Sequence, residues 1–121
     1  MSRRATIRAQ RLIRKRKPKT WCRVYVLKDP RSGKIRYVGQ TRMLLDERLR
    51  YHLKAPRKRI ARGRQRLSPV ELWIAELIGQ DLSPQIAAID HDGIWDISEA
   101  VWIDRISRDG GDLLNVMSRV A

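Results

Sequence analysis

The chain has 121 residues, 42% of them hydrophobic, which suits one compact domain. It contains no apolar run near the roughly 18 residues that a membrane span needs, and its single cysteine, Cys22, excludes an internal disulfide and a Cys-rich zinc site. We therefore expect a soluble, cytoplasmic protein without a membrane partner.

The net charge of +14 is unevenly distributed along the chain. Residues 1–66 hold 24 Lys/Arg and 3 Asp/Glu, whereas residues 67–121 hold 3 Lys/Arg and 10 Asp/Glu. This division predicts a basic surface that binds a polyanion, for which nucleic acid is the first candidate and an anionic membrane surface the alternative.

Residues 1–20 contain nine Lys/Arg and no acidic residue. We interpret them as a basic arm that is flexible until it lies along phosphates, with contacts from Arg14, Lys15, Arg16 and Lys17. An organelle transit peptide has a similar composition, and a solvated tail would look the same, so both alternatives stay open.

The first elements predicted after the arm form a β-hairpin. Residues 21–28 are rich in β-forming side chains, and turn residues at 29–33 separate them from a second strand at 34–38, which ends at Gly39. Leucines at helical spacing then predict a helix over residues 43–54, and we expect Pro56 to end it.

Residues 54–66 hold seven Lys/Arg and no acidic residue. They are predicted to form a basic loop that binds phosphates through Arg57, Lys58, Arg59, Arg62 and Arg64. Ser68-Pro69-Val70-Glu71 has the spacing of a capping box with proline at the first helical position, so a helix should begin there and end near Gly79.

The remaining predicted elements are a strand over residues 85–90, a turn at Asp92-Gly93 and a helix over residues 98–108 that Gly110-Gly111 stops. The order is β-β-α-α-β-α. It predicts an α+β domain over residues 21–121, in which helices cover one small sheet.

Two tyrosines on the hairpin are candidate functional residues. If the turn centres on Arg31, Tyr25 lies directly opposite Tyr37, and both phenols share one patch of the sheet. A routine aromatic cross-strand pair is the alternative interpretation.

Arg48 and His52 lie one turn apart beside the apolar stripe of the first predicted helix. Arginine presents a planar fork of donors that suits a phosphate, and histidine can bind a phosphate or move a proton. An exposed helix surface without a function is the alternative.

Glu99 lies on the apolar stripe of the last predicted helix. A carboxylate in that position needs a cation, a proton or a strong donor, and Mg²⁺ often takes only one or two protein carboxylates. However, Asp96-Ile97-Ser98-Glu99 also has capping-box spacing with Asp96 as the cap, so metal ligand and helix cap are both open.

In this order the residues resemble the GIY-YIG nuclease family, which includes homing endonucleases, some restriction enzymes and the incision module of bacterial excision repair. The first signature triplet appears as Arg23-Val24-Tyr25, which keeps only the tyrosine, and the second, after eleven intervening residues, as Tyr37-Val38-Gly39. The resemblance continues through Glu47 to His52, through Glu99 to Ile103, and ends at Leu113 to Val116.

The resemblance implies a small three-stranded antiparallel sheet flanked by helices and a metal-dependent endonuclease that hydrolyses DNA phosphodiester bonds. It implies one Mg²⁺ or Mn²⁺ on Glu99, and Tyr25 as the group that activates water once nearby cations lower its pKa. Tyr37 would position water or support Tyr25, and Gly39 would be a structural residue. Arg48 would offset charge on the transferring phosphoryl group, and His52 would contact the phosphate or relay a proton. Asn115 would brace the site by hydrogen bonds.

A non-catalytic nucleic-acid-binding protein, either RNA-binding or architectural, is the alternative function. It would explain the basic charge equally well, but it would not explain the ordered polar residues on three core-facing elements. Because the sequence contains no separate recognition domain, high sequence specificity would require a homodimer or a separate partner.

Overall fold

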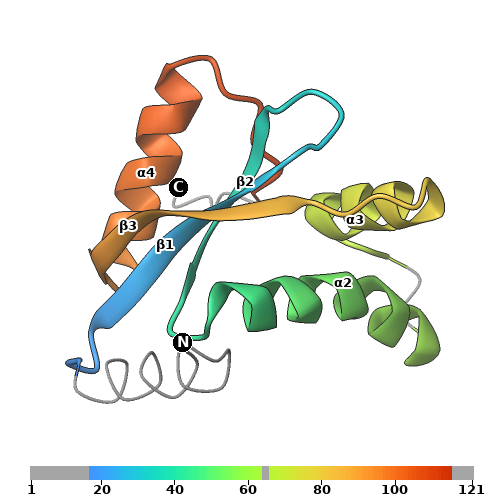
Figure 1. Ribbon diagram of the computed structural model, residues 1–121, viewed down its shortest axis with the longest axis horizontal. Coiled ribbons are helices and arrows are strands. Elements are labelled where there is room, and N and C mark those ends of the chain that lie inside the picture. Colours follow the sequence, from blue (N-terminus) through green and yellow to red (C-terminus); the bar gives the residue numbers. More distant parts are fainter. Residues whose placement is uncertain (1–16, 64–65, 116–121) are drawn as a thin grey trace, which may run out of the picture.

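The computed structural model describes residues 17–63 and 66–115 (Figure 1). Its elements follow one another as β1 (Trp21–Lys28), β2 (Ile35–Thr41), α2 (Leu45–Ala61), α3 (Pro69–Gly79), β3 (Gln85–Ile94) and α4 (Ile97–Arg108). The predicted order and the α+β fold class are therefore confirmed. The phosphate contacts predicted at Arg14, Lys15, Arg16 and Arg64 lie outside the described residues.

The three strands form one antiparallel sheet in the order β2-β1-β3. In Figure 1, α4 lies on one side of the crossing strands, and α2 and α3 lie on the other. The central strand β1 is buried on both faces, because its side chains alternate between two cores. Among the described residues, no helix is long and apolar enough to cross a membrane.

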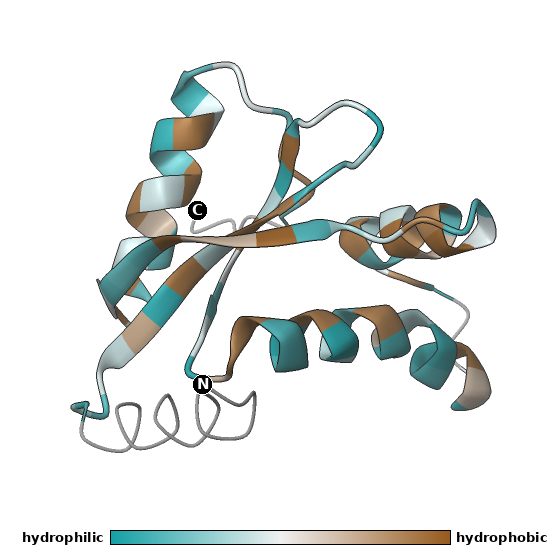
Figure 2. Cartoon of the chain, viewed as in Figure 1, coloured by the Kyte–Doolittle hydropathy of each residue, from teal (hydrophilic) through white to brown (hydrophobic). Residues whose placement is uncertain are grey.

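One core lies between the sheet and α4, where Cys22, Val24 and Val26 pack with Val38 and Ile103. The other core lies between the sheet and the helices α2 and α3, and its buried members are Tyr25, Leu27, Trp73, Ile74 and Leu77. Burial of each large apolar side chain contributes roughly 1.5–3 kcal/mol. Brown and teal residues alternate along α2 and α4 in Figure 2, as expected for helices with one apolar side.

The prediction that Pro56 ends the first helix is wrong, because α2 continues to Ala61 with Pro56 inside it. The predicted basic loop is therefore largely helical. Leu49 and Leu53 pack against the core, and Pro56 follows them at helical spacing and is itself buried. We attribute the continued helix to this packing, which offsets the hydrogen bond that proline cannot donate.

The hairpin register also differs from the prediction. Tyr25 pairs with Gly39, and Tyr37 pairs with Leu27. The Asp29 N–H donates to the Lys34 carbonyl, so the turn is centred half a residue later than predicted. An irregularity in the strand pairing after Leu27 accounts for the rest of the register shift. Because the total shift is even, both phenols stay on one face, with ring centroids 6.3 Å apart.

The element boundaries in the second half agree in part with the sequence. The Ser68 capping box is present, and Gly79 is the last residue of α3. In contrast, Asp92 and Gly93 form no turn but continue β3, where Gly93 pairs with Cys22. Asp96 provides no side-chain cap to α4 and adopts a left-handed backbone conformation with φ of 65°.

Candidate active site

The Tyr25 side chain occupies the space beside Gly39 on the neighbouring strand. Tyr25 is fully buried, and a Cβ atom at position 39 would lie 2.4 Å from both Cζ and the phenol oxygen of Tyr25. Gly39 is not one of the glycines with a positive φ. Glycine is therefore required at this position for steric reasons. The close pairing directs the Tyr25 hydroxyl past β2 towards α2.

Helix α2 supplies two side chains to this hydroxyl. The Arg48 Nε–H donates to the Tyr25 oxygen at 2.9 Å, and His52 Nε2 lies 2.6 Å from the same oxygen. Arg48 and His52 can both reach it because residues four apart lie on the same side of a helix. Tyr37 completes the group, with its ring centroid 5.4 Å from that of His52.

Burial determines the protonation of these groups. Burial raises the pKa of Tyr25 well above its ordinary value of 10, Tyr37 adds to this increase, and Arg48 opposes it without reversing it. The expectation that nearby cations lower the pKa of this tyrosine is therefore wrong for the described residues. Burial and the charge of Arg48 lower the pKa of His52 to about 4, so its imidazole is neutral at pH 7.

Glu99 lies in the first turn of α4, at the outer edge of β2. Its carboxylate accepts a hydrogen bond from the backbone N–H of Gln40. Burial raises the pKa of Glu99, and the charge of Asp96 raises it further. The Glu99 charge in turn contributes to the raised pKa of Tyr37, which shows that the carboxylate and the phenols belong to one electrostatic neighbourhood.

The Gln40 side chain was not among the residues predicted from the sequence. Its Oε1 accepts the backbone N–H of Asp96, and its Nε2 donates to the Asp96 carboxylate, both at 2.6 Å. Gln40 thereby fastens the start of α4 to β2 and contacts Glu99 through its backbone. Its position directly after Gly39 is the only sequence signal that could have identified it.

Asn115 lies farther along the same edge of β2. Its side chain accepts the Val38 backbone N–H at 3.0 Å and donates to the Val38 carbonyl at 2.7 Å. The Leu114 N–H also donates to the Arg36 carbonyl. These bonds give partners to backbone N–H and C=O groups that would otherwise be unpaired on an edge strand.

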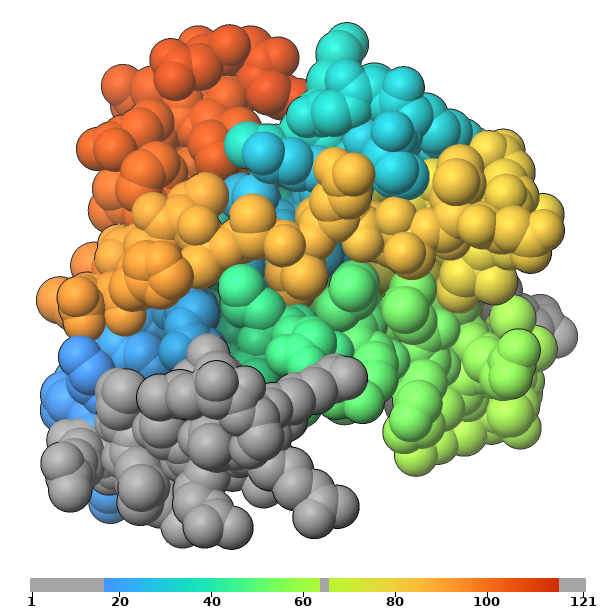
Figure 3. Space-filling view, in the orientation of Figure 1, coloured from blue at the N-terminus to red at the C-terminus, as the bar shows by residue number. Residues whose placement is uncertain are grey.

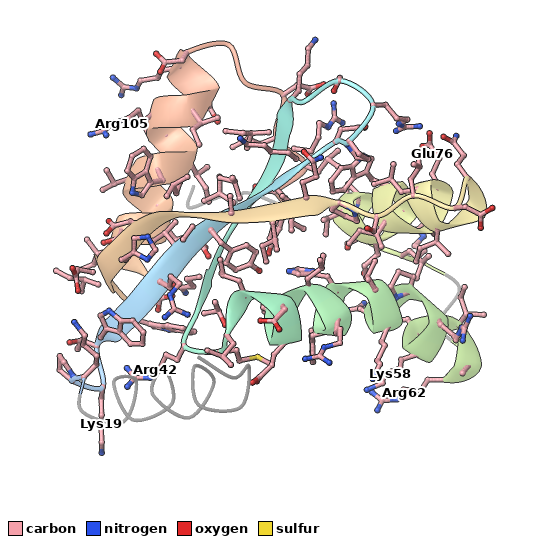
Figure 4. All side chains as sticks on the ribbon, viewed as in Figure 1. Lys19, Arg42, Lys58, Arg62, Glu76 and Arg105 are labelled. Carbon is pink, nitrogen blue, oxygen red and sulfur yellow. The ribbon has the colours of Figure 1, made fainter. Side chains whose placement is uncertain are left out.

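Many of the described cations lie along the side of the molecule formed by α2. Figure 4 shows Lys19 and Arg42 near one end of this side and Lys58 and Arg62 near the other, and Figure 3 shows the surface of α2 below that of β3. Two predicted phosphate contacts have acidic partners: Lys17 pairs with Asp92 at 2.9 Å, and Arg59 pairs with Glu71 at 2.8 Å.

The comparison with protein-family models agrees with this geometry. The model of the GIY-YIG catalytic domain matches residues 22–105. The chain belongs to the GIY-YIG family. Searches of curated proteins and of solved structures returned no significant match.

GIY-YIG domains are nuclease domains, and the family match includes five of the six side chains predicted for the site. The fold brings Tyr25, Tyr37, Arg48 and His52 together on the α2 face of the sheet. Glu99 lies at the adjoining edge of β2. Asn115 follows the matched segment and reaches the site only through the β2 backbone.

Proposed function

We propose that this GIY-YIG protein is a metal-dependent endonuclease that hydrolyses DNA phosphodiester bonds. The observation that carries the proposal is the hydrogen-bonded series Arg48–Tyr25–His52, held against Gly39 in a buried position. A phenol that has both a cationic donor and a neutral imidazole beside it is arranged to pass on a proton.

The proton path follows from the donors and acceptors. Arg48 donates to the phenol oxygen, so the Tyr25 O–H is left to donate to neutral His52 Nε2. As water attacks phosphorus, its proton passes to the Tyr25 oxygen while the phenol proton passes to His52 Nε2. The bond from phosphorus to the leaving oxygen breaks, and that oxygen departs as an alkoxide that takes a proton from solvent water. Tyr25 therefore acts as a neutral relay, consistent with its raised pKa.

The environment of Glu99 fits a divalent cation such as Mg²⁺ or Mn²⁺. The carboxylate is half-buried, Asp96 adds negative charge beside it, and within residues 17–63 and 66–115 it forms no salt bridge. Mg²⁺ is commonly held by one or two carboxylates, with water and phosphate oxygens as the other ligands. When bound, such an ion stabilises the negative charge on the phosphoryl and leaving oxygens.

The other residues support this chemistry. The Nε–H of Arg48 donates to the Tyr25 oxygen, so the terminal nitrogens of Arg48 would face the phosphoryl group and offset the charge of that group. Tyr37 packs against His52 and Tyr25 and restricts their positions. Asn115 braces β2 on the side opposite β1, which keeps Gly39 and Gln40 in register with the site.

Lys58 and Arg62, which lie on the α2 side (Figure 4), and Arg57 of α2 would bind backbone phosphates without reading the sequence. A non-catalytic nucleic-acid-binding protein would share this property but would have no use for the hydrogen-bonded Arg48–Tyr25–His52 series. A cleavage assay on plasmid DNA with Mg²⁺ separates the two functions. Nicked product supports the nuclease, and tight binding without nicking supports the alternative.

A further inference from the structure

A cavity of about 330 Å³ opens between α2 and the start of α3. Its inner wall includes the buried side chains of His52 and Glu71. Its exposed side carries three cations, Lys58, Arg59 and Arg62. Tyr51, whose side chain is 55% exposed, forms another part of the wall.

We propose that this cavity binds one unpaired nucleotide of the DNA next to the bond that is cut. This inference rests on the proposed nuclease function and adds the class of DNA that the site prefers. The cavity volume lies within the usual range for small-ligand sites, about 300–1,000 Å³.

The chemistry of the walls corresponds to the two parts of a nucleotide. Lys58 and Arg62 suit a phosphate, and the Tyr51 ring offers an aromatic surface on which a base can stack. Glu71 adds a carboxylate to the inner wall. Its Oε1 accepts the Ser68 N–H, whereas its buried Oε2 accepts no hydrogen bond from the described residues. Arg59 Nε lies 2.8 Å from Oε2, but this ion pair lacks the alignment of a hydrogen bond.

Two walls of the cavity contact the catalytic group directly. His52 reaches the Tyr25 oxygen through Nε2, and the guanidinium carbon of Arg48 lies 4.9 Å from the Tyr51 ring centroid. A nucleotide in the cavity would therefore adjoin the phosphate that Arg48 faces. A base can enter such a cavity only after it leaves the helical stack, and this costs least where the base is already unpaired.

The test measures binding in EDTA, so it does not depend on cleavage. Three labelled duplexes of one sequence are compared by fluorescence anisotropy: one with a single extrahelical nucleotide, one with an abasic unit in its place, and one fully paired. We expect the first duplex to bind about fivefold or more tightly than the other two, the effect of stacking one base on an aromatic side chain. Equal affinity for the extrahelical nucleotide and the abasic unit would overturn the proposal.

Two variants place this preference in the cavity. Ala55→Leu fills it from α2, and Tyr51→Leu removes the exposed ring without altering a core, so both should abolish the preference for the extrahelical base. Ala61→Leu is the matched control on the same helix, because Ala61 lines a separate apolar groove, and it should keep the preference. A preference that survives both Ala55→Leu and Tyr51→Leu would contradict the assignment.

Cleavage with Mg²⁺ distinguishes this proposal from the one on which it rests. If the protein cuts DNA but binds all three duplexes equally, the cavity assignment fails while the nuclease function stands. If the protein prefers the extrahelical nucleotide but cuts none of the three duplexes, the cavity is supported as a binding site and the nuclease function fails.

Discussion

Tyr25 and Gly39 are paired residues on neighbouring strands, and the tyrosine ring fills the space that a side chain on its partner would need. The phenol oxygen would lie only 2.4 Å from a Cβ at position 39. Because Arg48 and His52 both bond to that oxygen, Gly39 determines where the whole hydrogen-bonded group lies.

Gly39→Ala should therefore destabilise the protein by about 1–3 kcal/mol, the usual cost of overpacking a core. The cost should decrease in a Tyr25→Leu background, because the shorter side chain leaves room for the methyl group. Urea unfolding of the wild type, both single variants and the double variant gives the coupling free energy. An equal cost of Gly39→Ala in both backgrounds would show that the tyrosine ring is not the obstacle.

Tyr25→Phe keeps the ring beside Gly39 but removes the hydroxyl that bonds to Arg48 and His52. The rate of DNA cleavage should decrease by about 10² or more, which is the scale of general acid–base contributions. Affinity for DNA should hardly change, because one neutral hydroxyl adds little beside many cations.

Single-turnover cleavage with saturating enzyme is the appropriate measurement, since slow product release then cannot hide the chemical step. Tyr37→Phe is the matched control, because Tyr37 packs against the group and we assign it no proton transfer. Cleavage by Tyr25→Phe at nearly the wild-type rate would exclude Tyr25 from the proton path and leave His52 as the candidate.

The depressed pKa of His52 predicts a pH dependence of stability. Above about pH 6.5 the imidazole is neutral in both the folded and unfolded chains. As the pH falls below this value, the unfolded chain takes up a proton, whereas folded His52 does so only near its pKa of about 4. The free energy of unfolding should thus decrease by on the order of 2 kcal/mol between about pH 7 and about pH 5.

Urea unfolding at these two pH values measures this decrease, and His52→Gln supplies the comparison because glutamine does not titrate. The variant should lose much less stability over the same interval. An identical decrease in both proteins would assign the pH dependence to other groups.

The sequence predicted the element order well because each element carries a local signal. The Ser68 capping box and the β-forming residues of β1 act within a few positions of the chain, and the structure retains both. The α2 helix passes through Pro56 because burial against the neighbouring helix outweighs the local preference of proline. Such tertiary packing cannot be read from residues 54–66 alone.

The candidate site was predicted less completely, for similar reasons. Tyr25, Arg48 and His52 fall at spacings that place them on facing elements, and the fold brings them together. The two-position register shift depends on the turn closed by Asp29 and Lys34 and on the irregularity beside Leu27, neither of which was predicted from the sequence. The cap at Asp96, one of the two alternatives for this segment, is absent because Gln40, from a distant strand, holds that side chain instead.

Gln40→Ala tests this contact between β2 and the start of α4. Without the two bonds to Asp96, the Glu99 carboxylate should be held less firmly, since Gln40 supports it only through its backbone. The Mg²⁺ concentration for half-maximal cleavage should rise by about 10-fold or more, as for other residues that orient a metal ligand. The rate at saturating Mg²⁺ should change less.

Gln80→Ala is a suitable control, because the Gln80 side chain accepts a hydrogen bond from Arg31 and lies outside the candidate site. It should leave the Mg²⁺ requirement unchanged. If Gln40→Ala and Gln80→Ala behaved alike, Gln40 would have no part in holding Glu99.

The most direct test of the proposed function compares the wild type with Glu99→Gln on supercoiled plasmid DNA. The variant keeps an acceptor for the Gln40 N–H but loses the negative charge proposed to hold a divalent ion. We expect the wild type to nick the plasmid with Mg²⁺ and to stop when EDTA is added. Glu99→Gln should bind DNA with the same affinity and produce no nicks. Nicking by Glu99→Gln at the wild-type rate, or wild-type nicking undiminished by EDTA, would contradict a metal-dependent nuclease centred on Glu99.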